Sequence, residues 1–315
     1  MRTAAVVVTW EGGEPTRRCV ASLLAQTAPP DPIVVVDNAS GPAERARLHA
    51  DWDAEPRVRL LLLDDNRQIA GGLDAGAAAA FAAGADRVLL LNNDTVLDAD
   101  ALARLGAALD AHPDAGIAGP RVLDRSRDGA VLTAGERHAL WSLCLPRTLL
   151  RYRRGADAPY RVTGVMGCAL LVTRACFEAV GGFAREIEVY YEDVDFCLGA
   201  RARGFGAVLE PRAVVWHDGM RGFAAGLTPW AAFLKARNPW VLVRRRGGPA
   251  SWLVFVPTYA AMLGTSLALW LVRGRRDVAA ALARGAWAGV RAAFGAPVTP
   301  AGAPRRASAA PASGS

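Results

Sequence analysis

Two short segments of the chain have residue types that could do chemistry. Tyr190–Asp195 contains three carboxylates within four positions, and Val88–Thr95 is an apolar run that ends in two amides, a carboxylate and a hydroxyl. A buried strand that ends this way delivers oxygen ligands to the carboxyl edge of an α/β sheet, where such sheets bind their ligands. Because concentrated negative charge is costly without a cation or a proton-transfer role, the two segments together indicate an enzyme.

The elements that must position these segments alternate regularly through the first 120 residues. Short β-branched or leucine runs predict strands at 4–9, 33–37, 58–63, 88–91 and 116–118. Helix-like segments lie between or after them at 15–26, 42–52, 70–83 and 98–111. This alternation predicts an α/β fold with βαβ units and a mostly parallel central sheet flanked by helices.

Beyond residue 120 the pattern is less regular. Residues 121–160 are rich in Arg, Asp, Gly and Pro, and they predict a loop that could cover an active site. Further strands are expected at 167–173, 207–209 and 213–215, and a further helix at 192–204.

The C-terminal part of the chain is more hydrophobic. Residues 252–272 carry no charge and would span roughly 31 Å as a helix, about the thickness of a bilayer core. This favours a membrane-spanning or membrane-inserted helix, with a buried hairpin or a dimer interface as alternatives. Arginines flank both ends, so the positive-inside rule gives no orientation. The composition from residue 297 onward predicts a disordered tail.

The charge of the chain is unevenly distributed. From Lys235 onward twelve Lys and Arg residues accompany a single acid, Asp277, so this part carries +11 and the first 234 residues carry −4. A mildly acidic body with a basic C-terminal region is typical of a protein that binds a membrane surface, rather than nucleic acid. We therefore expect a membrane as partner and no nucleic acid.

The five cysteines are scattered, with neither a disulfide framework nor zinc-ligand spacing. This pattern predicts that the cysteines are core residues in a reducing compartment.

The first strand begins within a few residues of the N-terminus, without the pattern of a signal peptide. These two features predict a catalytic body in the cytoplasm.

Eight motifs in order resemble family 2 glycosyltransferases, and most of all the bacterial rhamnosyltransferase-like branch, which has the GT-A fold. They lie at residues 6–10, 34–40, 66–72, 90–95, 167–171, 181–183, 191–195 and 216–217. The resemblance covers about residues 3–240. It implies a GT-A catalytic domain at 1–240, followed by a membrane-associating helical region at 241–296 and the tail at 297–315.

The resemblance assigns several residues to a nucleotide-diphospho-sugar donor. Asp37, with Thr9 and Asn38 nearby, is expected to bind the nucleotide, since a carboxylate at a strand end can accept hydrogen bonds from a ribose or a base. A helix-capping turn is the alternative for Asp37.

Asn66, Arg67, Gly71 and Gly72 follow the third strand, where glycines let the backbone approach a diphosphate and an arginine can pair with phosphate. The segment departs from the family pattern at three positions, Gln68, Leu73 and Asp74.

Asn92, Asn93 and Asp94 occupy the place of the DxD motif of the family. A divalent cation, Mn²⁺ or Mg²⁺, takes oxygen ligands and often bridges protein carboxylate and phosphates. Only Asp94 is charged here, and the family places a second ligand at His217. A structural histidine at a strand end is the alternative for His217.

Asp193 is the predicted catalytic base, which removes the acceptor hydroxyl proton in a single, inverting displacement. Glu192 is expected to hold the acceptor or to orient the base. Asp195 is expected to cap its helix or to pair with Arg201 or Arg203. A further pair that the family often carries, Arg237-Asn238, is assigned a possible contact with phosphate or a lipid headgroup.

The sequence thus predicts an inverting, metal-dependent glycosyltransferase at the cytoplasmic face of the cell membrane. It would move a sugar, plausibly rhamnose from dTDP-rhamnose, to a lipid-linked or cell-surface polysaccharide acceptor. A catalytically degenerate relative that acts as a membrane-bound binding or scaffold subunit is the alternative. A nucleotidyltransferase is disfavoured because Thr9–Gly13 lacks the basic residues of a phosphate loop, and a dehydrogenase because no G-x-G-x-x-G follows the first strand.

Overall fold

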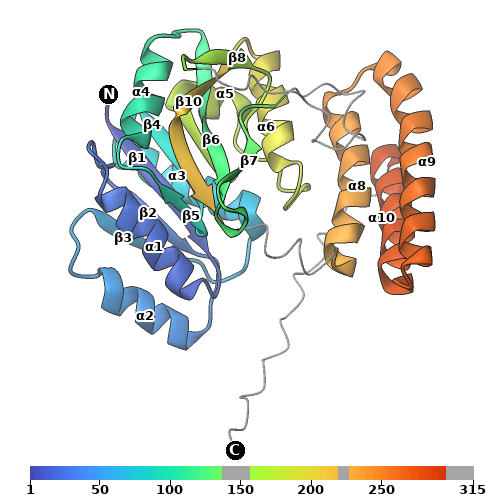
Figure 1. The fold of residues 1–315 in the computed structure, drawn as a ribbon, viewed down its shortest axis with the longest axis horizontal. Helices are drawn as coiled ribbons and strands as arrows, with labels where there is room; N and C mark the ends of the chain where they lie inside the picture. Colours follow the sequence, from blue (N-terminus) through green and yellow to red (C-terminus); the bar gives the residue numbers. More distant parts are fainter. Residues whose placement is uncertain (137–156, 219–226, 296–315) are drawn as a thin grey trace, which may run out of the picture.

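The computed structural model describes residues 1–136, 157–218 and 227–295, and the fold in these ranges is a mixed sheet covered by helices, with further helices packed at one side (Figure 1). The expected disordered tail at 297–315 lies outside the described residues. The strands are β1 Thr3–Thr9, β2 Ile33–Asp37, β3 Val58–Leu62, β4 Arg87–Asn92, β5 Thr95–Leu97, β6 Ala115–Asp124, β7 Ala130–Thr133, β8 Tyr160–Val162, β9 Ala169–Thr173 and β10 Gly206–His217. The helices are α1 Gly13–Leu24, α2 Pro42–Trp52, α3 Gln68–Ala82, α4 Ala101–Asp110, the 3₁₀ turn η1 Arg125–Arg127, α5 Arg174–Val180, α6 Glu192–Ala202, α8 Pro229–Arg246, α9 Pro249–Val272 and α10 Arg276–Phe294.

The sheet has the order β3-β2-β1-β4-β9-β6-β10-β5. Its first four strands are parallel, with Val6 of β1 level with Val34 of β2 and Leu90 of β4. Strand β9 is antiparallel to β4 and β6. The predicted α/β fold is confirmed, and the βαβ units put the carboxyl ends of β1, β2, β3 and β4 at one edge.

Both faces of the sheet are buried. Alternate residues of β1 point to opposite sides, so Val6 belongs to the core under α3, α5 and α6, and Val7 to the core under α1, α2 and α4. This two-sided burial explains why the strands appear in the sequence as continuous apolar runs. The four described cysteines are all buried, as expected of core residues.

The region after residue 115 contains more strand than the sequence predicts. The strand expected at 116–118 continues through Pro120 to Asp124, and β7 follows within the expected loop. The two short strands expected at 207–209 and 213–215 are one strand, β10. Pro120 has no N–H to donate, and the register shift in β10 after Glu210 lies opposite this proline, so the irregularity is absorbed without a break.

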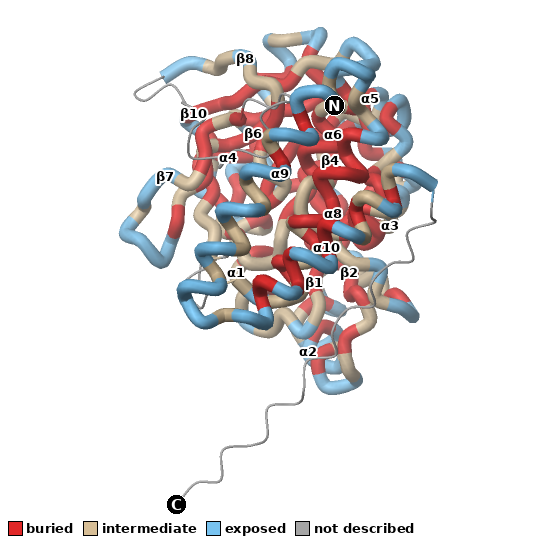
Figure 2. The backbone as a smooth tube through the Cα atoms, turned by 90° about the vertical axis from the view of Figure 1, so that its right-hand side faces the viewer, coloured by how far each residue is buried: buried red, intermediate tan, exposed pale blue. Residues whose placement is uncertain are grey.

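A third core joins the C-terminal helices to the sheet domain. It contains Ile187 and Val194 from the sheet domain together with residues of α8, α9 and α10. Helix α8 runs through residue 240, where the sequence analysis places the end of the catalytic domain. That domain boundary stays a prediction. Figure 2 shows α9 with a largely exposed outer surface.

Ion pairs reinforce this junction. The buried Asp195 carboxylate accepts hydrogen bonds from Arg245 and Arg246 at the end of α8, with both oxygens engaged. The predicted pairing of Asp195 with Arg201 or Arg203 is therefore wrong. The Arg203 guanidinium instead donates to the carbonyl of Gly199.

We predict that Asp74→Asn stabilises the protein above pH 6. Asp74 lies on α3, accepts a hydrogen bond from the Phe183 N–H at 2.9 Å, and burial raises its pKa to about 6. A carboxyl whose pKa is higher in the folded than in the unfolded state favours folding at low pH, and this contribution is lost as the pH rises from about 4 to about 6. An amide can accept the same hydrogen bond without charge, so the variant should gain about 1 kcal/mol at pH 8. Urea unfolding at several pH values checks this, and a gain of the same size at pH 4 and pH 8 would contradict it.

Candidate active site

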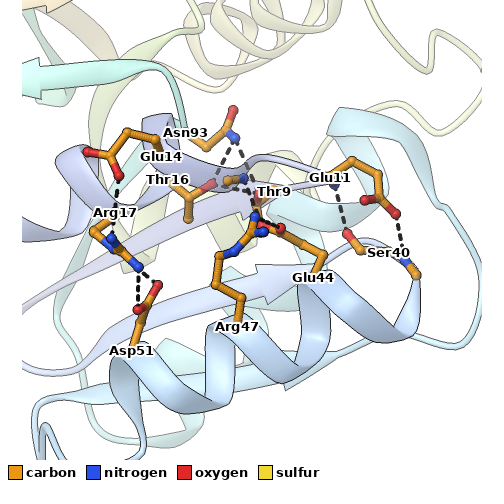
Figure 3. Close-up of polar contacts among 12 residues, drawn as sticks. Thr9, Glu11, Glu14, Thr16, Arg17, Ser40, Glu44, Arg47, Asp51 and Asn93 are labelled. Carbon is orange, nitrogen blue, oxygen red and sulfur yellow. Dashed lines mark hydrogen bonds and ion pairs between the residues drawn. The ribbon is translucent and has the colours of Figure 1, made fainter. Parts of the chain in front are cut away.

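The carboxyl end of β1 forms a network of small polar side chains with the end of β4 (Figure 3). The Thr9 and Thr16 hydroxyls lie 2.8 Å apart, and the Asn93 amide donates to both, at 3.2 and 3.0 Å. A Cβ on Gly12 would lie within 2.3 Å of all three side chains. Sequence reasoning identified Thr9 and Asn93 but missed Thr16 and Gly12, for which the Gly12-Gly13 pair after β1 was the available signal.

The turn after β1 is fixed to the start of α2 (Figure 3). The Glu11 N–H donates to the Ser40 hydroxyl, and the Glu11 carboxylate accepts from the Gly41 N–H at 2.6 Å. The Gly13 N–H donates to the buried Glu44 carboxylate at 2.7 Å. These contacts, which the sequence did not predict, hold the first turn of α1 beside the ends of β1 and β2.

The ends of β2 and β3 bring four of the predicted donor residues together. Asp37 is completely buried and accepts hydrogen bonds from the Ser40 N–H and, at 2.8 Å, from the Arg45 guanidinium. The contact with Ser40 is the turn geometry of the structural alternative. Asn38 bridges to the β3 side, because its amide accepts from the Arg67 N–H and donates to the Asn66 side chain.

Gly71 and Gly72 lie in the first turns of α3 and are buried. A Cβ on Gly72 would approach the Val8 side chain of β1 to 2.7 Å, and one on Gly71 would approach the Cβ of Arg67 to 2.6 Å. Close packing of α3 on β1 is therefore one reason for a glycine at position 72.

Asp94 and His217, the predicted metal ligands, face each other. Asp94 follows β4, and His217 ends β10, where it is level with Thr95 of β5. Asp94 Oδ1 lies 3.2 Å from His217 Nε2, and the two side chains are 29% and 14% exposed. The buried His217 Nδ1 has no hydrogen-bond partner within the described ranges.

A carboxylate and an imidazole are suitable ligands for a divalent transition metal ion. No group of three or more His, Cys, Asp or Glu residues able to hold a metal occurs in the part of the chain that the structure describes. The pair thus fits a cation that takes its remaining ligands from a bound molecule or from water.

Asp193 lies in the first turn of α6, where the partial positive charge of the helix end stabilises a carboxylate. Its two oxygens accept hydrogen bonds at 2.8 Å from the N–H groups of Gly167 and Val194. The Asn92 N–H donates to the Cys168 carbonyl at 3.0 Å, so Asp193 reaches the end of β4 through Gly167 and Cys168. Asp193 therefore belongs to the same sheet edge as Asp94, and Glu192 is its neighbour at the start of the helix.

The loop before α6 is strained. Glu188, Tyr190 and Tyr191 have φ angles of 59°, 62° and 72°, in the left-handed region that side chains disfavour. Such residues cost of order 1–3 kcal/mol each and persist only where the surrounding structure holds them.

Two buried residues of α8 hold this loop. Asn238, which is 0% exposed, donates to the carbonyls of Ile187, Val189 and Tyr190 at 2.8 to 2.9 Å. Arg237, which is 1% exposed, pairs with Glu188 and donates to the loop backbone. The expected contact of this pair with phosphate or a lipid headgroup is wrong, because both side chains are buried and engaged with the loop.

A pocket of about 450 Å³ is lined in part by Trp216, the residue before His217 on β10. Its lining residues are Val96, Asp98, Arg125, Asp128, Gly129 and Trp216. The Trp216 indole N–H donates to Asp98 at 2.9 Å. An aromatic ring bordered by charged side chains is a surface on which a sugar ring can stack and form hydrogen bonds.

Comparisons with a family profile and with known proteins agree on one family. The profile described as Glycosyl transferase family 2 matches residues 4–178. A Mycobacterium tuberculosis protein named N-acetylglucosaminyl-diphospho-decaprenol L-rhamnosyltransferase is 30% identical over 233 residues, which are 67% of this chain and 74% of that protein. The Shigella flexneri dTDP-rhamnosyl transferase RfbF is 24% identical over 228 residues, 69% of this chain and 72% of that protein.

Solved structures show the same fold. The mannosyltransferase PcManGT from Pyrobaculum calidifontis, solved in complex with GDP-Man and Mn²⁺, has a TM-score of 0.58 and 20% identity. The match covers 92% of this chain and 87% of PcManGT. Other matching structures are longer, and this chain spans 43% of their length.

We predict that Asn238→Ala loosens the loop before α6 beyond its effect on global stability. Loss of one donor to three buried carbonyls should lower the free energy of unfolding by about 2–4 kcal/mol. The matched control is Leu242→Ala, which truncates a fully buried side chain of the same helix at a similar cost. Hydrogen exchange at residues 187–191 should increase in Asn238→Ala and stay near the parent rate in Leu242→Ala. Equal exchange in the two variants would show that the loop holds its shape without Asn238.

Proposed function

This chain belongs to glycosyl transferase family 2, and from this premise we propose that it transfers one sugar, with inversion and with a divalent cation, from a nucleotide diphosphate to an acceptor hydroxyl. The chain is a glycosyltransferase of the GT-A fold. The observation that carries the proposal is the facing pair Asp94 and His217, which lies on the sheet edge to which Asp193 is also tied.

The donor would bind along this edge. The residues proposed for its nucleotide and diphosphate are Thr9, Asp37, Asn38, Asn66, Arg67, Gly71, Gly72, Asn92 and Asn93. The Arg67 guanidinium supports this role, because it is 43% exposed and is paired with the exposed Asp65, so it can exchange that partner for a phosphate. Arg45 pairs with Asp37 and would hold this carboxylate in place beside the nucleotide.

Asp94 and His217 would hold the cation, Mn²⁺ or Mg²⁺. When bound, the cation offsets the charge that develops on the departing diphosphate. The likeness to PcManGT, whose crystals contain Mn²⁺, supports this assignment.

Asp193 would act as the base. The acceptor oxygen forms a bond to the anomeric carbon while the bond from that carbon to the diphosphate oxygen breaks, and the acceptor proton moves to the Asp193 carboxylate. The hydrogen bonds from Gly167 and Val194 fix the direction in which this carboxylate points. Glu192 would hold or orient the acceptor, and Arg237 with Asn238 would act as positioning residues through the loop.

The named relatives support a deoxyhexose donor and a lipid-linked acceptor. We propose rhamnose, carried by dTDP, as the sugar, and a membrane-bound diphospholipid or surface polysaccharide as the acceptor. The C-terminal helices would place the enzyme at the cytoplasmic face of the cell membrane. A degenerate scaffold protein is the alternative, and metal-dependent turnover of dTDP-rhamnose by the purified chain would exclude it.

We predict that Asp193→Asn keeps donor binding and loses transfer. The amide retains the shape of the side chain but cannot take a proton, so the rate should fall by about 10²–10⁴. The thermal shift produced by dTDP-rhamnose with Mn²⁺ should stay near that of the parent and serves as the control for folding. A transfer rate close to the parent would rule out Asp193 as the base.

We predict that Asp94→Asn lowers the affinity for the divalent cation that supports donor binding. Loss of the charged ligand should raise the Mn²⁺ concentration that half-saturates the thermal shift by roughly tenfold or more. The matched control is Asp53→Asn, a change of the same charge at an exposed residue at the C-terminal end of α2, and it should leave the titration unchanged. An unchanged Mn²⁺ titration in Asp94→Asn would remove this residue from the ligand set.

A further inference from the structure

Helix α9 has an outer face that is entirely uncharged. The helix runs for 24 residues, and it is the one helix of the described residues that is long and apolar enough to cross a membrane. Leu253 and Val272, near its two ends, are 79% and 87% exposed. The other exposed large apolar side chains of this face are Val254, Val256, Leu269 and Leu271. In Figure 2 exposed residues recur along the length of α9.

The opposite face of α9 packs along its whole length. Phe255 and Tyr259 are buried in the N-terminal half, and Met262, Leu267 and Trp270 pack against the same core further along. The neighbouring helices are α8 and the antiparallel α10, which lie beside α9 in Figure 1. The helix is therefore not a separate anchor, because it shares a core with α8.

The two threonine hydroxyls of α9 are satisfied inside the helix. The Thr258 hydroxyl donates to the carbonyls of Val254 and Phe255, and the Thr265 hydroxyl to those of Ala261 and Met262. Hydroxyls that donate back to their own helix present little polarity to the surroundings. This arrangement suits a helix in contact with hydrocarbon.

Four exposed arginines lie just after α9 and on the neighbouring helix α10. Arg273 and Arg276 follow its C-terminal end, and Arg284 and Arg291 lie on the exposed side of α10. None of the four makes an ion pair with any residue within 1–136, 157–218 or 227–295. An apolar face beside unpaired cations is complementary to a bilayer with anionic headgroups.

We infer that α9 lies flat in the surface of an anionic membrane, with its outer face among the headgroups and upper acyl chains, and that it does not cross the bilayer. A crossing α9 would carry α10, with Arg284 in the middle of that helix, to the same depth in the hydrocarbon. It would also have to leave α8, which Asp195 and Glu188 hold to the sheet domain. The inference rests on the proposed function in one respect, since a membrane-bound acceptor gives this docking a purpose.

A second copy of the chain fits the face less well. Two copies that met through α9 would bring two sets of these arginines close together, and the only acid after residue 235 is Asp277, which already pairs with Arg275. Like charges at such an interface oppose association.

Vesicle flotation tests the contact surface. The full chain should float with vesicles of phosphatidylglycerol and phosphatidylcholine, and less with phosphatidylcholine alone. Leu253→Glu combined with Leu271→Glu should reduce binding by roughly tenfold or more. The matched control, Ala46→Glu with Ala50→Glu, adds the same charge to exposed positions of α2 and should bind like the parent. Flotation of the α9 variant at the parent level would overturn the inference, as would a parent dimer in solution that the α9 variant breaks while neither protein floats.

Cysteine labelling separates the flat from the crossing arrangement. Gly248→Cys and Arg273→Cys place single thiols at the two ends of α9, in a Cys144→Ser background in which the four described cysteines are buried. A Cβ at Gly248 meets no atom within 4 Å. A membrane-impermeant maleimide added outside the vesicles should label both ends, and protection of one end would show a crossing helix.

The same proteins distinguish this inference from the proposed function. Retention of the dTDP-rhamnose thermal shift by the α9 variant would show that donor binding and docking are independent. Flotation without any donor shift in the parent would support the docking and contradict the function.

Discussion

The anchoring of the loop before α6 by Arg237 and Asn238 is the interaction on which the position of the proposed base depends. Three residues of this loop have left-handed backbone conformations, and three of its carbonyls accept hydrogen bonds from one buried amide. The loop leads directly into the helix turn that carries Asp193. The position of the proposed base is thus set by a helix that begins more than thirty residues later in the chain.

The other groups of the site owe their proximity to the sheet. Parallel strands end at one edge, so Thr9, Asp37 and Asn92 converge although they are far apart in sequence. The antiparallel strand β9 then brings Gly167 and Cys168 to the same edge. Strand β10 delivers His217 opposite Asp94. Backbone pairing therefore determines which polar side chains meet, and the turns after the strands determine how they are oriented.

The sequence predicted well those features that depend on local pattern. The early strands and helices follow from apolar runs, and motif order singled out Asp94 and His217, which lie 3.2 Å apart. It failed where a partner lies far along the chain. Asp195 was matched to nearby arginines, whereas its partners are Arg245 and Arg246, because helical spacing says nothing about contacts between α6 and α8. Thr16 was missed for the same reason, since its amide partner is 77 residues away.

The shared core of α8, α9 and α10 has a consequence for how this enzyme can be handled. A shorter fragment that ends before residue 229 would lose Asn238 and the arginines that pair with Glu188 and Asp195. The C-terminal helices therefore cannot be removed by truncation without loss of contacts that hold the candidate active site. A preparation that keeps the site intact therefore has to retain α8, α9 and α10.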